Sequence, residues 1–340
     1  LVSLVTWVAM VVLMFTAGMD VSVEDIRPTG RSGIYITLFA WLIPFLAALV
    51  YAPLIDQPDN GRLFPIFFAL NVAETALPVL AKILHEHGMN GSKWGSLILV
   101  SGGLQDLVGV IGVAFMIETV RTPSSDLISL LISFILKVLF LCLMTSMLFV
   151  SYYSIRRWLS GVDEHYFLLP LGFAAAWLFQ SAGYHAALGA FVAGVFVRKY
   201  VGKPDSRVNP LKSISDRFLI PVFLLNIGFQ LDVLTWIKNP IAEWLLPTVI
   251  IAILAKVLGA YVGAKAAGIP SDIALTIGIC MSARGMFGIV LAGIGRENGL
   301  YSQSVFELVI SMSVLTTLAV PVILHLRRLS WGTWVGRRVW

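Results

Sequence analysis

The sequence consists almost entirely of long apolar segments separated by short stretches that contain charges, Gly and Pro. A helix needs about 20 apolar residues to cross the hydrocarbon core of a bilayer, which is roughly 30 Å thick. Eleven segments have about this length or more. They lie near residues 1–19, 34–55, 63–85, 94–119, 126–153, 165–181, 184–201, 213–231, 241–265, 271–295 and 303–326. The sequence therefore predicts an all-α, polytopic membrane protein with about 11 transmembrane helices.

The composition excludes a soluble fold, because 58% of the 340 residues are apolar and only 13% are charged. A net charge of +5 can indicate nucleic acid as a partner, but basic residues in a membrane protein first report topology. Cys142 and Cys280 lie inside apolar segments, where neither a disulfide framework nor a metal site is expected. We find no Walker loop, nucleophile elbow or zinc-ligand pattern. We therefore expect membrane lipid as a partner, no nucleic acid, no cofactor and no metal centre.

The basic residues are distributed unevenly between the loops. Of the 24 Lys and Arg residues, three lie well inside the segments, and those at segment ends are counted with the adjoining loops. Four others lie in the loops on one side of the predicted membrane: Arg62, Arg121, Lys238 and Arg296. The remaining 17 lie in the loops of the other side, at the segment ends that adjoin them or in the C-terminal stretch, and such a concentration marks the cytoplasmic side. We predict a protein of the bacterial inner (plasma) membrane with a cytoplasmic C-terminus.

Ionisable residues inside the segments are the best candidates for a functional site. A charge near the bilayer centre costs about 2.5 to 3.5 kcal/mol, so it usually faces a cavity or a partner and marks an ion path. Asp106 lies mid-segment in SGGLQDLVGVIG, directly after Gln105. Because burial disfavours the charged form of a carboxyl group, Asp106 can exchange a proton for a cation near neutral pH. A structural carboxylate bonded to a Lys is the less favoured interpretation.

Two Lys residues also lie inside segments. Lys256, in IAILAKVLGAYVG, can neutralise an acidic partner such as Asp106 while the site is empty and release it when a proton or cation binds. The alternative is a Lys whose side chain extends to the interface, which its distance from both segment ends disfavours. For Lys137, extension to the interface or a hydrogen bond between helices is the favoured explanation.

Two segments contain polar and helix-breaking residues in their middle, namely ALNVAETALPVLAKIL and TIGICMSARGMFGIVLAGIG. Discontinuous helices whose ends face a midplane site are typical of transporters built from inverted repeats. Taken singly, Pro78 indicates a simple kink and the Gly285 and Gly288 pair indicates close helix packing. Arg284 favours two broken helices, because a guanidinium among exposed carbonyl ends can hold a crossing pair together.

Several motifs occur in an order that resembles the monovalent cation:proton antiporter-2 family. They are FTAGMDVSVEDIRPTGR, TALPVLAKILHEHGM, the Gln105 and Asp106 pair, ALGAFVAGVFV, PVFLLNIGFQLD, AKVLGAYVGAKAAGIP and SARGMFGIVLA. The family includes bacterial potassium-efflux and sodium/proton antiporters and plant cation/proton exchangers. The resemblance implies an antiporter fold with inverted repeats and two crossing broken helices. It also implies thirteen helices, so we expect one or two N-terminal helices to be missing here.

The resemblance assigns roles to several residues. It makes Asp106 the carboxylate that binds the ion and carries the proton, with Gln105 where other branches have Asp or Asn. A single acid after Gln resembles the potassium-efflux and electroneutral branches. Thr75 and Pro78 match the first broken helix, Lys256 matches the family's basic residue, and Arg284 and Gly285 match the second broken helix. Glu74 is a departure, because small or hydroxyl residues are usual at that position.

The sequence thus predicts a transporter rather than an enzyme, over one transmembrane antiporter domain at 1–340. We expect core helices at about 63–153 and 241–326, and dimer or scaffold helices at about 1–55 and 165–231. The predicted function is secondary active antiport of K⁺ or Na⁺ against H⁺ by alternating access, in a homodimer.

Competition at Asp106 would couple the two ions, and oxygen ligands would come also from Gln105, Thr75 and Glu74. Two alternatives stay open. One is an antiporter-like enzyme or sensor that uses Asp106, Glu74 and Arg284 on an organic substrate. The other is an organic-anion symporter.

Overall fold

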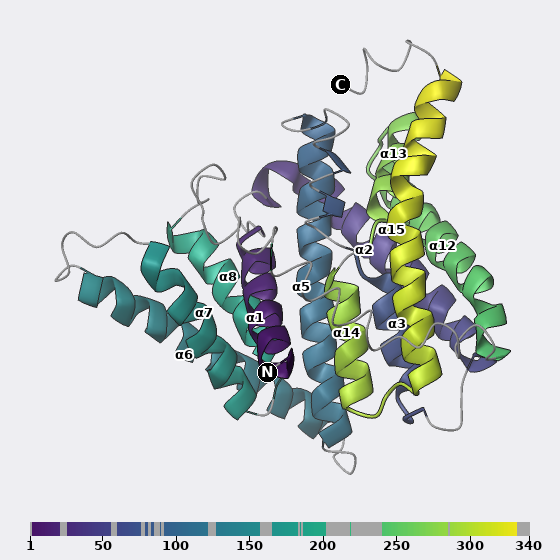
Figure 1. The fold of residues 1–340 in the computed structure, drawn as a ribbon. Coiled ribbons are helices and arrows are strands. Elements are labelled where there is room, and N and C mark those ends of the chain that lie inside the picture. The colour runs from purple at the N-terminus through teal and green to yellow at the C-terminus, as the bar shows by residue number, and fades with distance from the viewer. Residues whose placement is uncertain are drawn as a thin grey trace. The chain divides into compact units, whose positions relative to one another are not determined.

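The structure is a computed structural model in which every regular element of the described residues is a helix (Figure 1). It describes residues 2–20, 26–55, 60–75, 79–80, 83–84, 89, 92–121, 127–156, 165–182, 184, 186–201, 218, 240–284 and 286–331. The α-helices are α1 (Val2–Asp20), α2 (Ile26–Tyr51), α3 (Phe64–Ala73), α5 (Lys93–Arg121), α6 (Leu127–Arg156), α7 (His165–Ser181), α8 (Ala186–Val201), α12 (Leu245–Ala266), α13 (Ser271–Met281), α14 (Met286–Glu297) and α15 (Gln303–Trp331). A short 3₁₀ helix, η1 (Ala52–Leu54), follows α2, and another, η3 (Pro240–Trp244), precedes α12.

The helices coincide with the apolar segments expected from the sequence, except that 213–231 lies outside the described residues apart from Phe218. Four helical stretches are long and apolar enough to cross a membrane, by length and composition, in the part of the chain that is described. They are Gly30–Leu54, Lys93–Val120, Ile241–Ala266 and Gln303–Arg327. The expected all-helical membrane fold is confirmed.

The chain forms two compact units. The first unit comprises residues 1–23 and 114–231. Helix α8 packs against α1 and α7, and α6 packs against α7 and α8 (Figure 1). The second unit comprises residues 24–113 and 232–340, and in it α12 packs against α2, α13 and α15, while α3 packs against α2 and α14. Helix α5 contributes to both units. The division into core and scaffold helices expected from the sequence stays a prediction.

Glycines bring helices into close contact within each unit. In the first unit, a Cβ added to Gly18 of α1 would lie 2.1 Å from the carbonyl oxygen of Phe191 on α8. In the second unit, a Cβ at Gly259 of α12 would lie 2.4 Å from the carbonyl oxygen of Phe39 on α2. Such contacts require the absence of a side chain, and small residues are common where helices cross inside membranes. Packing between backbones therefore positions the helices that carry the site.

The outward surface of the helices is apolar. Helix α6 exposes large hydrophobic side chains along its length, including Leu136, Leu139 and Phe140, each with more than half of its surface accessible. A soluble protein rarely exposes a contiguous apolar surface of this kind. Such a surface suits the apolar interior of a bilayer, as expected for an integral membrane protein.

Candidate ion-binding site at two broken helices

The site begins where α3 ends in the middle of an apolar segment. Helix α3 stops at Ala73, and Glu74 has an extended backbone with φ −69° and ψ 154°. The last helical residues and the next two are buried, including Asn71, Glu74 and Thr75. The predicted break in this segment is confirmed, although Pro78 lies outside the described residues. The break leaves backbone carbonyl groups without the partners that a continuing helix would supply.

A second break separates α13 from α14. Helix α13 stops at Met281, and the Ser282 hydroxyl donates to the carbonyl oxygen of Ile279 at 2.6 Å, within its last turn. Helix α14 then begins at Met286. The interruption expected here is confirmed, and Gly285 is outside the residues that the structure describes. Polar groups are thus available at a second helix end inside the protein.

The two breaks lie against each other. The side-chain amide of Asn71, on the last turn of α3, donates to the carbonyl oxygen of Gly288 on α14 at 3.0 Å. The Thr75 hydroxyl lies 3.2 Å from the carbonyl oxygen of Met281, at the end of α13. The sequence prediction that the broken helices meet is therefore confirmed.

Two buried basic side chains cap the end of α3. Arg284 Nη1 donates to the carbonyl oxygen of Asn71 at 2.8 Å, and Nη2 donates to that of Val72 at 2.5 Å. Lys256 Nζ, from α12, donates to the carbonyl oxygen of Ala73. Both side chains are almost completely inaccessible. Positive charge at a helix C-terminus is favourable because the helix dipole places partial negative charge there, so the two residues stabilise the break.

Helix α5 supplies the polar pair that faces this helix end. Gln105 Oε1 accepts hydrogen bonds from Lys256 Nζ at 2.6 Å and from the Thr75 hydroxyl at 2.7 Å. The adjacent Asp106 is 2% accessible. It lies within electrostatic range of both Glu74 and Lys256. The structure therefore brings together Asp106, Gln105, Thr75, Glu74, Lys256 and Arg284, as expected from the sequence.

Lys256 serves more than one partner. Its ammonium group donates to a helix-end carbonyl and to Gln105, in addition to its electrostatic interaction with Asp106. The expectation that Lys256 neutralises Asp106 in the empty site, and releases it when a proton or cation binds, stays a prediction. Sequence reasoning did not identify the carbonyl partner, because a backbone oxygen at a helix end has no signature of its own in the sequence.

Glu74 occupies a space that a glycine leaves open. A Cβ added to Gly109 of α5 would lie 2.1 Å from Glu74 Oε2, so the carboxylate fills the position of the missing side chain. Glu74 interacts electrostatically with Asp106, Lys256 and Arg284, and its carboxyl group is close enough to that of Asp106 for a hydrogen bond when one of them is protonated. Neither Glu74 oxygen accepts a hydrogen bond from any described N–H or O–H group. The oxygens are thus available to a proton or a cation.

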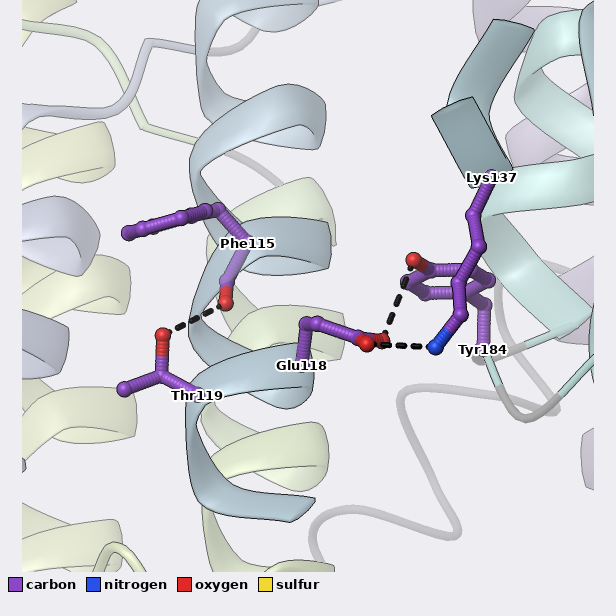
Figure 2. Close-up of polar contacts among 5 residues, drawn as sticks. All are labelled: Phe115, Glu118, Thr119, Lys137 and Tyr184. Carbon is purple, nitrogen blue, oxygen red and sulfur yellow. Dashed lines mark hydrogen bonds and ion pairs between the residues drawn. The ribbon is translucent and has the colours of Figure 1, made fainter. Parts of the chain in front are cut away.

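A further buried acid belongs to the first unit (Figure 2). Glu118, near the end of α5, accepts from Lys137 Nζ of α6 at 2.5 Å and from the Tyr184 hydroxyl at 3.2 Å. The hydrogen bond between helices expected for Lys137 is confirmed. Sequence reasoning missed Glu118 because it lies close to its segment's end, although an intramembrane Lys signals that an acidic partner is needed.

Within the described ranges, no group of three or more His, Cys, Asp or Glu side chains is arranged to hold a metal ion. The side-chain oxygens near the broken helices are instead those of carboxylate, amide and hydroxyl groups, which suit hard monovalent cations. Two carboxylates and two basic side chains are buried together there. Their formal charges cancel when all four are ionised, which reduces the cost of burying them.

Comparisons with known proteins identify relatives of this chain. The model of the family described as "Sodium/hydrogen exchanger, transmembrane" matches residues 2–326. A Na⁺/H⁺-K⁺ antiporter of Bacillus cereus, GerN, is 26% identical over 93% of this chain and 81% of its own length. A K⁺/H⁺ antiporter of Saccharomyces cerevisiae is 24% identical over 93% of this chain but only 38% of its own length.

The fold likewise resembles a solved structure of the sodium proton antiporter MjNhaP1 from Methanocaldococcus jannaschii. The TM-score is 0.63, the sequence identity is 16%, and the match covers 97% of this chain and 84% of that one. The family model spans nearly the whole chain, including both broken helices and the polar pair on α5. The chain therefore belongs to the transmembrane sodium/hydrogen exchanger family.

Proposed function

We propose that the chain exchanges a monovalent cation, K⁺ or Na⁺, for H⁺ across the membrane by alternating access. Relatives named as Na⁺/H⁺ antiporters, including one from Enterococcus hirae that is 24% identical over 93% of this chain, support cation/proton exchange. The yeast and Bacillus cereus relatives are named for K⁺ as well. The transported ions are substrates, and the proposal requires no cofactor.

The observation that carries the proposal is a buried carboxylate, Asp106, which interacts with Glu74 and Lys256 in the unit where two broken helices meet. Gln105, Thr75 and Glu74 contribute oxygens, and Lys256 and Arg284 balance the negative charge. A carboxylate binds either a proton or a cation, so competition for Asp106 couples the two movements. Coupling also requires that the site reorients only when it holds a proton or a cation.

Alternating access requires one group of helices to move relative to another. We propose a single antiporter domain in which core helices at about 63–153 and 241–326 move against dimer or scaffold helices at about 1–55 and 165–231. We further propose a homodimer in a bacterial inner membrane with the C-terminus in the cytoplasm. The uneven distribution of Lys and Arg between the loops supports this orientation.

The organic-anion symporter is disfavoured by the geometry of Arg284. Both of its terminal nitrogens donate to carbonyl oxygens at the end of α3. Two of its N–H groups thus bind the protein's own backbone, which supports a structural role for this side chain over contact with a substrate carboxylate. The enzyme or sensor hypothesis has no comparable support, since the family is one of transporters.

Proton movement into proteoliposomes, followed with a pH-sensitive dye, tests the proposal. Addition of Na⁺ or K⁺ should change the internal pH in vesicles that carry the wild-type protein. Asp106→Asn, which keeps the side chain's size but cannot ionise, should abolish the signal. The matched control is Glu118→Gln, an acid-to-amide change at the buried carboxylate of the first unit, and it should retain exchange. Exchange that persists in Asp106→Asn would contradict the proposal.

A further inference from the structure

The two buried carboxyl groups of the site, those of Glu74 and Asp106, lie close together, which the sequence pattern does not predict. Asp106 and Gly109 are three residues apart on α5, so they share one face of that helix. The Glu74 carboxylate packs against Gly109. A Cβ added to Gly109 would lie only 2.1 Å from Glu74 Oε2. The carboxylate therefore lies beside Asp106, although the two residues come from different helices.

The basic residues of the site do not neutralise Glu74 by direct hydrogen bonds. Arg284 uses both terminal nitrogens on the carbonyl oxygens of Asn71 and Val72. Lys256 donates to Ala73 and Gln105. Glu74 is 2% accessible, and both of its oxygens lack a donor among the described residues. A buried carboxylate without hydrogen bonds is costly unless something positive binds it.

Two carboxylates that share a buried site do not readily stay ionised together, because like charges in close contact repel each other. A pair of this kind holds one proton between its oxygens or one cation in the same place. The Glu74 and Asp106 carboxyl groups are close enough to share a proton through a hydrogen bond.

We propose that Glu74 and Asp106 act as one binding unit that holds either a single shared proton or a single monovalent cation, and that Gly109 positions Glu74 for this role. This inference rests on the proposed antiport function. When a cation enters, the shared proton leaves to water on the open side, and two carboxylates then hold one cation. The proton-loaded and cation-loaded pairs both carry one negative charge. Exchange is therefore one proton for one cation and moves no net charge.

The pair also makes Glu74 a determinant of affinity and of pH dependence. With Glu74 present, the cation contacts two carboxylates instead of one. Removing its charge leaves Asp106 facing a neutral group, which makes the Asp106 carboxylate easier to form in acid. Loss of Glu74 should therefore weaken cation binding and extend exchange to lower pH.

The test compares wild type, Glu74→Gln, Gly109→Ala and Gly112→Ala in proteoliposomes, with Na⁺ and K⁺ as the probes at several pH values. Glu74→Gln is nearly isosteric. It should raise the half-maximal cation concentration on the order of tenfold or more and move the pH of half-maximal exchange downward by about one unit, the usual scale of a nearby charge. Gly109→Ala displaces the Glu74 carboxylate and should act in the same direction.

Gly112→Ala is the matched control on the same helix. Its added Cβ would lie 2.9 Å from Leu70 Cδ2, the far end of a side chain that can rotate away, so it should behave like the wild type. In a Glu74→Ala background, where the space is empty, Gly109→Ala should have no further effect. Additive losses there would show that Gly109 acts by some means other than Glu74.

The outcomes separate this inference from the proposed function. If the wild type shows no cation-dependent proton movement, antiport itself is wrong. If the wild type exchanges ions and Glu74→Gln keeps the same cation affinity and pH profile, the shared pair is wrong while antiport stands. A transport current recorded from wild-type protein adsorbed on a solid-supported membrane would also overturn the shared pair, because one-for-one exchange should give none.

Discussion

At the scale of single residues, the site is organised by the end of α3. Three consecutive carbonyl groups, those of Asn71, Val72 and Ala73, accept hydrogen bonds from Arg284 or Lys256. The Thr317 hydroxyl of α15 in turn donates to the Arg284 carbonyl oxygen at 2.5 Å. These contacts hold the basic residues on backbone atoms, and the Glu74 oxygens have no hydrogen-bond donor among the described residues.

Replacing Arg284 by Ala should destabilise the protein strongly. The change leaves two buried carbonyl oxygens without their charged donor and removes a positive charge near Glu74. We expect a loss of about 3 kcal/mol in the free energy of unfolding, seen as a lower thermal midpoint in detergent.

Arg327→Ala is the matched control for this substitution. Arg327 is half-buried and donates to the carbonyl oxygen of Asp272 at 2.7 Å in a solvent-exposed hydrogen bond, so its loss should cost only about 1 kcal/mol. Equal destabilisation by the two substitutions would contradict the capping role of Arg284.

The residues of the site could be predicted from the sequence, but their contacts could not. Asp106, Glu74 and Arg284 are visible because ionisable groups are rare within apolar segments. That Gly109 makes room for Glu74 depends on two helices approaching each other, and the sequence around Gly109 indicates only that some close approach occurs. Partners on other helices are set by packing rather than by local pattern.

At the scale of elements, close backbone contact fixes how helices cross. Helix α12 lies on α2 through Gly259 and Gly263, where added Cβ atoms would lie 2.4 and 2.5 Å from backbone carbonyl oxygens. Backbone atoms cannot move aside as a flexible side chain can. This contact therefore sets the position of α12 and with it the position of Lys256.

Gly259→Ala should destabilise the second unit by about 1 to 3 kcal/mol, the usual cost of overpacking. It should also reduce transport, because a shift of α12 moves Lys256 away from α3. Thermal unfolding and the proteoliposome assay measure the two effects.

Gly293→Ala on α14 provides the control, since no neighbouring atom lies within 4 Å of the added Cβ. It should be neutral or stabilising by up to about 1 kcal/mol, because Ala is a better helix former than Gly. If both substitutions were harmless, close contact between α12 and α2 would not be what positions Lys256.

The elements were the most predictable feature of the fold. Apolar runs of sufficient length gave the helices, and a polar interruption with Pro78 or with Arg284 and Gly285 gave the two breaks. Which helices pack against each other was harder to predict from the sequence. Helix α2 packs against α12, which is about 200 residues away along the chain, and no local pattern reports such a contact.

At the scale of the whole molecule, the account requires a fixed orientation in the membrane. In the proposed orientation, which rests on the excess of Lys and Arg, Lys265 at the end of α12 lies on the cytoplasmic side and Arg62, before α3, on the opposite side. Both positions are exposed in the structure. They can therefore report orientation without disturbing the packed helices.

Single cysteines at these positions, in a background with Cys142 and Cys280 replaced by Ala, should differ in their reactivity. A thiol reagent that does not cross membranes should label Arg62→Cys in intact cells, and Lys265→Cys only after the membrane is opened. Mass spectrometry of the purified protein measures the labelling. The reverse pattern would contradict the proposed orientation.

Competition between a proton and a cation for the same carboxyl groups is the central claim, and it can be measured without transport. Purified protein in a weakly buffered detergent solution is mixed with Na⁺ or K⁺, and released protons are followed with a pH dye. The account predicts release of about one proton per chain by the wild type, because cation binding requires deprotonated ligands, and none by Asp106→Asn. Folded wild-type protein that releases no proton with either ion, or equal release by Asp106→Asn, would contradict it.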